Sequence, residues 1–281
     1  MCTSKISVRK FLKLLGEVYF YNVLFFAIFT LTGYAPFSPE SFLNVIFPFF
    51  DVSDSFTTCF LLFYLFIPFL NILLNGMTEK QHAALVGLCL FIYTIISSVP
   101  KLGGNVDFNY VTWFTVLYFL SSYIRLYPKE IYNNTKLWGW LSLGSVLLSW
   151  ASMIVIAFFD RLLGKDYSVY FFVADSNKIL AVVTALCAFM FFKNVKIKQS
   201  RWINTCAAST FGVLLIHANS DAMRQWLWKD VLDNVSYYQS EWLVVHACCA
   251  VVGVYVLCTI IDQIRIMIIE KPLLWCLDAK Q

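Results

Sequence analysis

Long apolar runs separated by short polar connections dominate the chain. An α-helix needs about 20 predominantly apolar residues to cross a bilayer. Eight runs of roughly this length can be marked, at 14–33, 55–75, 82–99, 108–124, 137–159, 177–192, 202–217 and 242–261. The pattern predicts an all-α fold, a polytopic transmembrane helical bundle of about eight spans.

Three parts of this pattern are irregular. The runs 177–192 and 202–217 fall just under the usual spanning length, so either is predicted to be a broken or re-entrant element beside a cavity. Prolines interrupt the segment 34–54, which is predicted to be a loop with a short interfacial helix. No internal repeat or long linker divides the chain, so residues 1–281 are predicted to form one transmembrane domain.

Composition agrees with a lipid environment and excludes several classes of protein. Hydrophobic residues make up 60% of the chain and charged residues 14%, whereas soluble domains carry about 25% charged residues. The formal net charge is only +4 and its basic residues lie beside apolar runs, which predicts membrane lipids and no nucleic acid as partners. No Gly-rich phosphate loop, H-E-x-x-H or G-x-S-x-G motif is present, and we expect no metal and no bound cofactor.

The distribution of Lys and Arg predicts the orientation. Placing the N-terminus inside assigns most of the 21 basic residues to cytoplasmic segments. The remaining ones would lie outside: Lys101, Arg161, Lys165, Lys178, Arg224 and Lys229. The predicted location is the inner (plasma) membrane, with multiple spans and both termini in the cytoplasm.

The richest polar cluster follows the run 202–217. His217 ends an apolar helix, and Asn219, Asp221 and Arg224 follow within two turns. Imidazole, carboxylate and guanidinium are expected to converge there on an anionic or hydroxylated ligand, where general-base chemistry is conceivable. The alternative is that His217 caps the helix by bonding a loop carbonyl, while Trp226 and Trp228 belong to the aromatic belt at the membrane interface.

A second polar cluster lies within the run 55–75. Asn71 and Asn75 stand four residues apart on one helix face, beyond Pro68, which frees a backbone carbonyl. A polar substrate pocket is one interpretation. The other is that these amides hydrogen-bond a neighbouring helix without meeting any substrate.

Two further polar features have structural interpretations. His82 and His246 are expected to be structural. The basic segment 193–201 would attract anionic headgroups or a phosphorylated cytosolic donor, although topology signalling alone also explains it.

Three segments resemble motifs of one family. Residues 209–217, with Arg224 and Trp228 after them, look like "S-x-F-G-x-Y-L-I-H" and its following loop, with Leu214 in place of Tyr. Residues 64–71 are similar to "Y-L-x-x-P-F-L-N", and residues 270–272 to an "E-x-P" tail. On these segments the chain resembles the membrane-bound acyltransferases known as acyltransferase family three.

The resemblance implies transfer of acetyl from cytosolic acetyl-coenzyme A, the acyl donor, across the membrane. The implied glycan acceptor is a cell-surface polysaccharide or a lipid-linked sugar, modified on a hydroxyl. Family members typically begin with two more helices that bear an Arg and a His implicated in acyl transfer. This chain starts after them, so we expect it to be N-terminally truncated relative to the family, without a counterpart of that histidine.

The resemblance leaves the catalytic residues unassigned. His217 and Arg224 are weak candidates, with His217 in acceptor-side positioning. Candidate substrate-binding residues are Asn71, Asn75, Asn219, Asp221 and Trp228. Two alternatives stay open: a catalytically inactive relative that pairs with a partner subunit, and a transporter or polymerase of surface polysaccharide.

Overall fold

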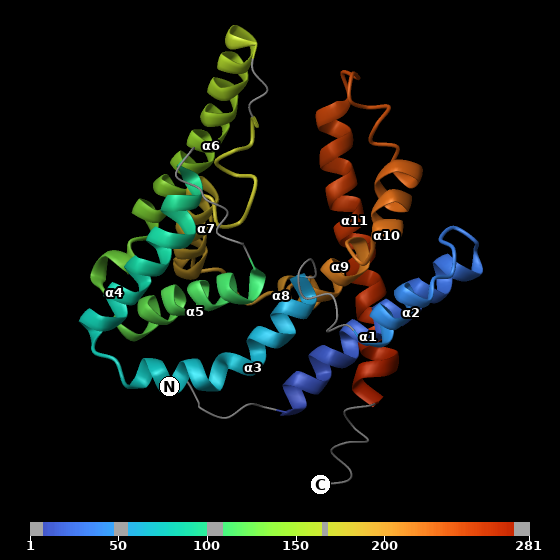
Figure 1. Cartoon of the computed structure of the whole chain (residues 1–281), viewed down its shortest axis with the longest axis horizontal. Helices are drawn as coiled ribbons and strands as arrows, with labels where there is room; N and C mark the ends of the chain where they lie inside the picture. The colour runs from blue at the N-terminus through green and yellow to red at the C-terminus, as the bar shows by residue number, and fades with distance from the viewer. Residues whose placement is uncertain (1–7, 48–55, 100–108, 165–167, 273–281) are drawn as a thin grey trace. The chain divides into compact units, whose positions relative to one another are not determined.

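The fold is helical throughout the part of the chain that the structure describes. A computed structural model describes residues 8–47, 56–99, 109–164 and 168–272. It is 80% helical and contains no strand within these ranges (Figure 1). The predicted all-α class is confirmed.

Five described helical segments are long and apolar enough to cross a membrane. They are α1 (Val8–Leu31), α3 (Phe56–Asn75), the segment Glu79–Ser98, α6 (Thr135–Leu163) and the segment Leu243–Glu270. Segment Glu79–Ser98 joins α4 (Glu79–Leu90) to the π-helical turn η1 (Phe91–Ile95) and the 3₁₀ turn η2 (Ile96–Ser98). Segment Leu243–Glu270 joins α11 (Leu243–Arg265) to the π-helical turn η5 (Ile266–Glu270).

The other three predicted runs also form helices, but shorter ones. The run 108–124 becomes α5 (Tyr110–Leu126), and 177–192 becomes α7 (Ile179–Asn194). The run 202–217 divides into α8 (Arg201–Ala208) and α9 (Thr210–His217). Helices therefore lie where the apolar runs predict them, but the count of eight spans is not confirmed.

The break between α8 and α9 was one of the predicted irregularities. At Ser209 the backbone has φ −94° and ψ 0°, outside regular helix geometry. Gln263 of α11 donates from Nε2 to the Ser209 hydroxyl over 2.7 Å. A side chain from a neighbouring helix therefore binds the point where the helix is interrupted.

The short helix predicted in the proline-rich segment is α2 (Pro39–Ile46). Pro39 occupies its first turn, where no backbone N–H is needed, and the Ser38 side chain caps its N-terminus. Its helical conformation is confirmed, and its interfacial location stays a prediction.

The described chain forms two compact units, and α3 passes from one to the other. One unit comprises the described residues from 62 to 197, and the other comprises those from 8 to 61 and from 198 to 272. In the first unit α6 packs along α7 and α4 along α5. The 3₁₀ turn η3 (Glu130–Asn133) precedes α6.

His82 is part of the packing in this first unit. Its side chain is fully buried, and Nε2 lies 3.0 Å from the backbone oxygen of Phe119 in α5. This contact joins α4 to α5 and agrees with the structural role expected from the sequence.

The second unit is built around α1, α9 and α11, which pack against one another. Its apolar core includes Val18, Tyr21 and Phe25 of α1, together with Val213 and Ile216 of α9. The short helix α10 (Asp221–Gln225) and the π-helical turn η4 (Trp226–Val231) follow α9. This packing brings polar residues of three helices together.

Candidate functional site

A buried group of charged side chains lies where α1 meets the end of α11. Arg265 is at its centre, and each of its three guanidinium nitrogens contacts a different carboxylate. Nε lies 2.9 Å from Asp262, Nη1 lies 3.1 Å from Glu270, and Nη2 lies 3.1 Å from Glu17. All four side chains are at most 10% exposed.

Two further residues complete this group. The Tyr21 hydroxyl donates to Oδ1 of Asp262 over 2.9 Å, and the Arg265 guanidinium lies 5.7 Å from the Tyr21 ring centroid. Lys13 Nζ contacts Glu270 over 2.6 Å, while 45% of the Lys13 side chain stays exposed. We call Lys13, Glu17, Tyr21, Asp262, Arg265 and Glu270 the Arg265 cluster.

The spacing of these residues explains how two helices build the cluster. Glu17 and Tyr21 are four apart in α1, and Asp262 and Arg265 are three apart in α11, so each pair occupies one helix face. Apart from Thr259, the other buried residues of these two helices are apolar, and burying a charge without a partner costs on the order of several kcal/mol. The charges therefore have to meet each other for α1 and α11 to pack.

Helix α9 approaches the cluster through Gly212. A Cβ atom at this position would lie 2.3 Å from the carboxyl carbon of Asp262 and 2.3 Å from its Oδ1. The carboxylate thus fills the space that any side chain at position 212 would need. Its other oxygen, Oδ2, is buried without a hydrogen-bond partner in the described structure.

The charges of the cluster do not balance when every group is ionised. Glu17, Asp262 and Glu270 would carry three negative charges, against one each on Lys13 and Arg265. One proton or one additional cation would make the cluster neutral.

His217 lies on the same helix as Gly212, five residues further on. At 1.5 Å per residue this is about 7.5 Å along α9. Its Nδ1 lies 2.6 Å from the backbone oxygen of Val213. A carbonyl only accepts, so Nδ1 carries the hydrogen and Nε2 of a neutral ring keeps its lone pair. The ring meets Trp228 edge to face, 6.4 Å between centroids.

Neighbouring residues of α1 link the segment after His217 to the cluster. Asn219 donates from Nδ2 to Oδ1 of Asn22 over 3.1 Å. The residue before Asn22 is Tyr21, which bonds Asp262. The segment 217–219 and the Arg265 cluster are therefore parts of one polar region of the second unit.

Asp221 and Arg224 are arranged differently from the expected convergence. Their side chains bind each other over 3.1 Å and are 89% and 57% exposed, respectively. Among the described residues, Asp221 contacts Arg224, and His217 contacts Trp228. These two pairs are separate. An ion pair this exposed contributes little to stability.

Asn71 and Asn75 differ in their burial. Asn71 is buried and its Oδ1 accepts a hydrogen bond from the hydroxyl of Tyr118 in α5, whereas Asn75 is exposed at the end of α3. The bond to α5 is the kind expected from the interpretation of Asn71 as a link between helices.

The family model described as an acyltransferase domain matches residues 3–263, which is most of the chain. The chain belongs to acyltransferase family three. No curated protein and no solved structure matched it.

Membership in acyltransferase family three confirms the resemblance drawn from the motifs. Together with the long apolar helices, it supports a membrane acyltransferase in general terms. The matched range includes Glu17, Tyr21, Gly212, His217 and Asp262. The polar region of the second unit is therefore our candidate site for this acyltransferase.

The Arg265 cluster is not among the sites expected from the sequence, although one signal for it exists. Glu17 stands inside an apolar run, where an ionisable residue is costly and by default functional. In the sequence, Arg265 reads as an orientation signal, and Glu270 as part of a motif. The spacing along the chain did not indicate that these residues meet.

Replacing Gly212 should test the close approach of α9 to Asp262. Gly212→Ala places a methyl group where the carboxylate lies, and Tyr21 and Arg265 hold that carboxylate in place. We expect destabilisation of about 1–3 kcal/mol, seen as a lower melting temperature in detergent. Gly253→Ala is the matched control on α11, since nothing lies within 4 Å of a Cβ there. Equal melting temperatures for the two variants would contradict the described packing.

Replacing Arg265 should test the cluster as a whole. Arg265→Met leaves three carboxylates buried around an apolar side chain, which should cost about 3–5 kcal/mol of stability. Adding Glu17→Gln removes one of those charges and should recover part of the loss. Thermal unfolding of the single and double variants measures this coupling, and strictly additive effects would rule it out.

Proposed function

We propose that this protein is an O-acetyltransferase of the inner (plasma) membrane. It takes acetyl from cytosolic acetyl-coenzyme A and transfers it to a hydroxyl of a cell-surface polysaccharide or lipid-linked sugar. The observation that carries the proposal is that α9 joins a buried charged cluster at Gly212 to a histidine with an available Nε2 at His217, in a chain of this family.

The orientation predicted from the basic residues places the Arg265 cluster and His217 toward opposite sides of the membrane. With both termini in the cytoplasm, the start of α1 and the end of α11 lie at the cytoplasmic side, and so does the Arg265 cluster. His217 ends α9 toward the opposite side. The cluster then belongs to the donor side and His217 to the acceptor side.

The basic connection between α7 and α8 supports a cytosolic anionic donor. Lys196 and Lys198 in this connection are exposed. Coenzyme A carries several phosphates, and clustered positive charge raises the local concentration of such a ligand.

The chemistry requires one proton to move. The acceptor hydroxyl oxygen attacks the thioester carbonyl, a C–O bond forms, the C–S bond breaks, and the hydroxyl proton ends on the sulfur of coenzyme A. In our proposal Nε2 of His217 accepts a hydrogen bond from the acceptor hydroxyl and orients it. The bond from Nδ1 to Val213 fixes the tautomer that leaves Nε2 able to accept.

The Arg265 cluster has a positioning role in this proposal. Its side chains are too deeply buried to be the first groups that a glycan meets, but they fix α9 relative to α1 and α11. The helix that carries His217 is thereby held in one place.

Acetyl transfer can be measured directly. Membranes containing the full chain, supplied with radiolabelled acetyl-coenzyme A and surface glycan, should yield glycan with label that mild alkali releases, as expected for an ester. Membranes without the protein serve as the control. Absence of label from glycan and lipid-linked sugar alike would refute the proposed activity and favour an inactive relative.

Replacing His217 tests its assigned role. His217→Gln should lower kcat/KM for acceptor by about 10²-fold, since a misplaced reacting group commonly costs about that factor. His246→Gln is the matched control, because His246 bonds Asn234 and stacks on Tyr237. We expect its activity to stay unchanged. The role fails if both variants keep full activity at equal melting temperature.

A further inference from the structure

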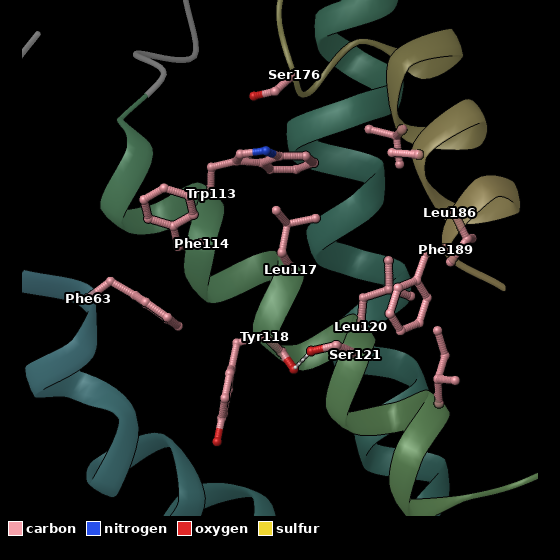
Figure 2. Close-up of a pocket in the computed structure, with 13 residues that line it drawn as sticks. Phe63, Trp113, Phe114, Leu117, Tyr118, Leu120, Ser121, Ser176, Leu186 and Phe189 are labelled. Atoms are coloured by element: carbon pink, nitrogen blue, oxygen red, sulfur yellow. Dashed lines mark hydrogen bonds between the residues drawn. The ribbon is translucent and has the colours of Figure 1, made fainter. Parts of the chain in front are cut away.

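A separate pocket lies in the first unit, between α3, α5 and α7. Its volume is about 450 Å³. Figure 2 shows Phe63 of α3 on one side, Trp113 and Leu117 of α5 in the wall, and Leu186 and Phe189 of α7 opposite. Pockets of a few hundred cubic ångströms are the size at which proteins enclose small molecules or parts of larger ones.

The wall offers almost nothing to a polar ligand. None of its lining residues is charged, and its hydroxyl groups belong to Tyr118, Ser121 and Ser176. Tyr118 donates to Asn71, and Ser121 donates to the backbone oxygen of Tyr118 over 3.1 Å, the dashed line in Figure 2. Two of the three hydroxyls are therefore already engaged with the protein.

Water is a poor occupant of such a space. A buried water typically makes two to four hydrogen bonds, and apolar cavities without these partners stay dry. An empty pocket is also unfavourable, because atoms lining a void lose their packing contacts. The pocket is best suited to a hydrocarbon group.

The surroundings of the pocket supply hydrocarbon. Leu117 of α5 and Phe189 of α7 line it and are also 37% and 52% exposed. α3 is one of the helices long and apolar enough to span a bilayer. In a membrane, the exposed apolar residues at the mouth face lipid chains.

We propose that this pocket holds one acyl chain of a bilayer phospholipid, which enters between α5 and α7. The pocket selects a lipid by its acyl chain and not by its headgroup, since the lining residues offer no charge to hold a phosphate. The cation nearest in sequence to Ser176 is Lys178, which already donates to the backbone oxygen of Ser97 over 2.7 Å and lies over the Phe171 ring. An abundant membrane phospholipid satisfies this requirement without any specific headgroup contact. The inference does not depend on the proposed acetyl transfer.

Photolabelling of the full chain in lipid vesicles tests this site. The vesicles contain phosphatidylethanolamine, phosphatidylglycerol and a phospholipid with a diazirine in the middle of one acyl chain. After illumination, mass spectrometry compares adducts on residues 110–126 and 179–194 with adducts on the lipid-exposed α6. We expect an excess of label on α5 and α7, because the enclosed chain stays in contact longer than passing lipid.

Filling the pocket should abolish this excess. Leu186→Trp places an indole in the pocket, and Ala185→Phe is a second lining variant in case the first does not fold. Val183→Trp is the matched control, because Val183 is exposed on the same helix but does not line the pocket. We expect both lining variants to lose the excess label and the control to keep it, at comparable melting temperatures.

Two results would overturn the proposal. Uniform labelling of α5, α6 and α7, unaffected by the lining variants, would show that no chain is held. Displacement of the phospholipid label by a trace of polyprenyl phosphate would assign the pocket to a lipid-linked substrate and not to phospholipid.

Discussion

Three buried carboxylates require positive charge beside them, and the guanidinium of Arg265 supplies it. The second unit is organised around this requirement. Each of the guanidinium nitrogens contacts a different acid, on α1, on α11 and on the turn that follows α11. The planar group holds these contacts in fixed directions, which the single ammonium of a lysine could not do. Removing any one acid changes the charge balance for the others, so the contributions of these side chains to stability are coupled.

The same requirement explains the irregular course of the chain around α9. Asp262 stands against Gly212, and the next residue, Gln263, binds Ser209 at the break between α8 and α9. Adjacent residues of α11 thus hold two points of the interrupted segment. The break shortens α9 to the length between Ser209 and His217, and it sets where the imidazole ends up relative to the buried acids.

The positions of the helices could be predicted from the sequence because an apolar run is a local property. The run 137–159 lies within α6, and the run 242–261 lies almost wholly within α11. The number of spans could not be derived in this way, because the length of an apolar run does not fix the length of the helix that forms within it: the run 202–217 divides into α8 and α9. His217 and Asn219 could be selected as candidates from their place after an apolar helix, and their functional role stays a prediction. Glu17 and Arg265 could not be selected in this way, since nothing in the spacing of residues so far apart shows that they touch.

The polar cluster after His217 shows the limit of arguing from neighbours in sequence. Asp221 and Arg224 are close enough to His217 to suggest a shared ligand, yet they bind each other at the surface. The groups that do share a region with His217 come from α1, through Asn22 and Tyr21. Proximity along the chain therefore does not show which of these side chains touch each other.

The contact between Gly212 and Asp262 also constrains how this sequence can change over generations. While an aspartate occupies position 262, every substitution at 212 brings a side chain into the space of its carboxylate. If position 262 first changes to a residue with a shorter side chain, position 212 becomes free to accept alanine or serine. Substitutions at these two positions are therefore accommodated more readily in this order, and diverging descendants should show them changing together.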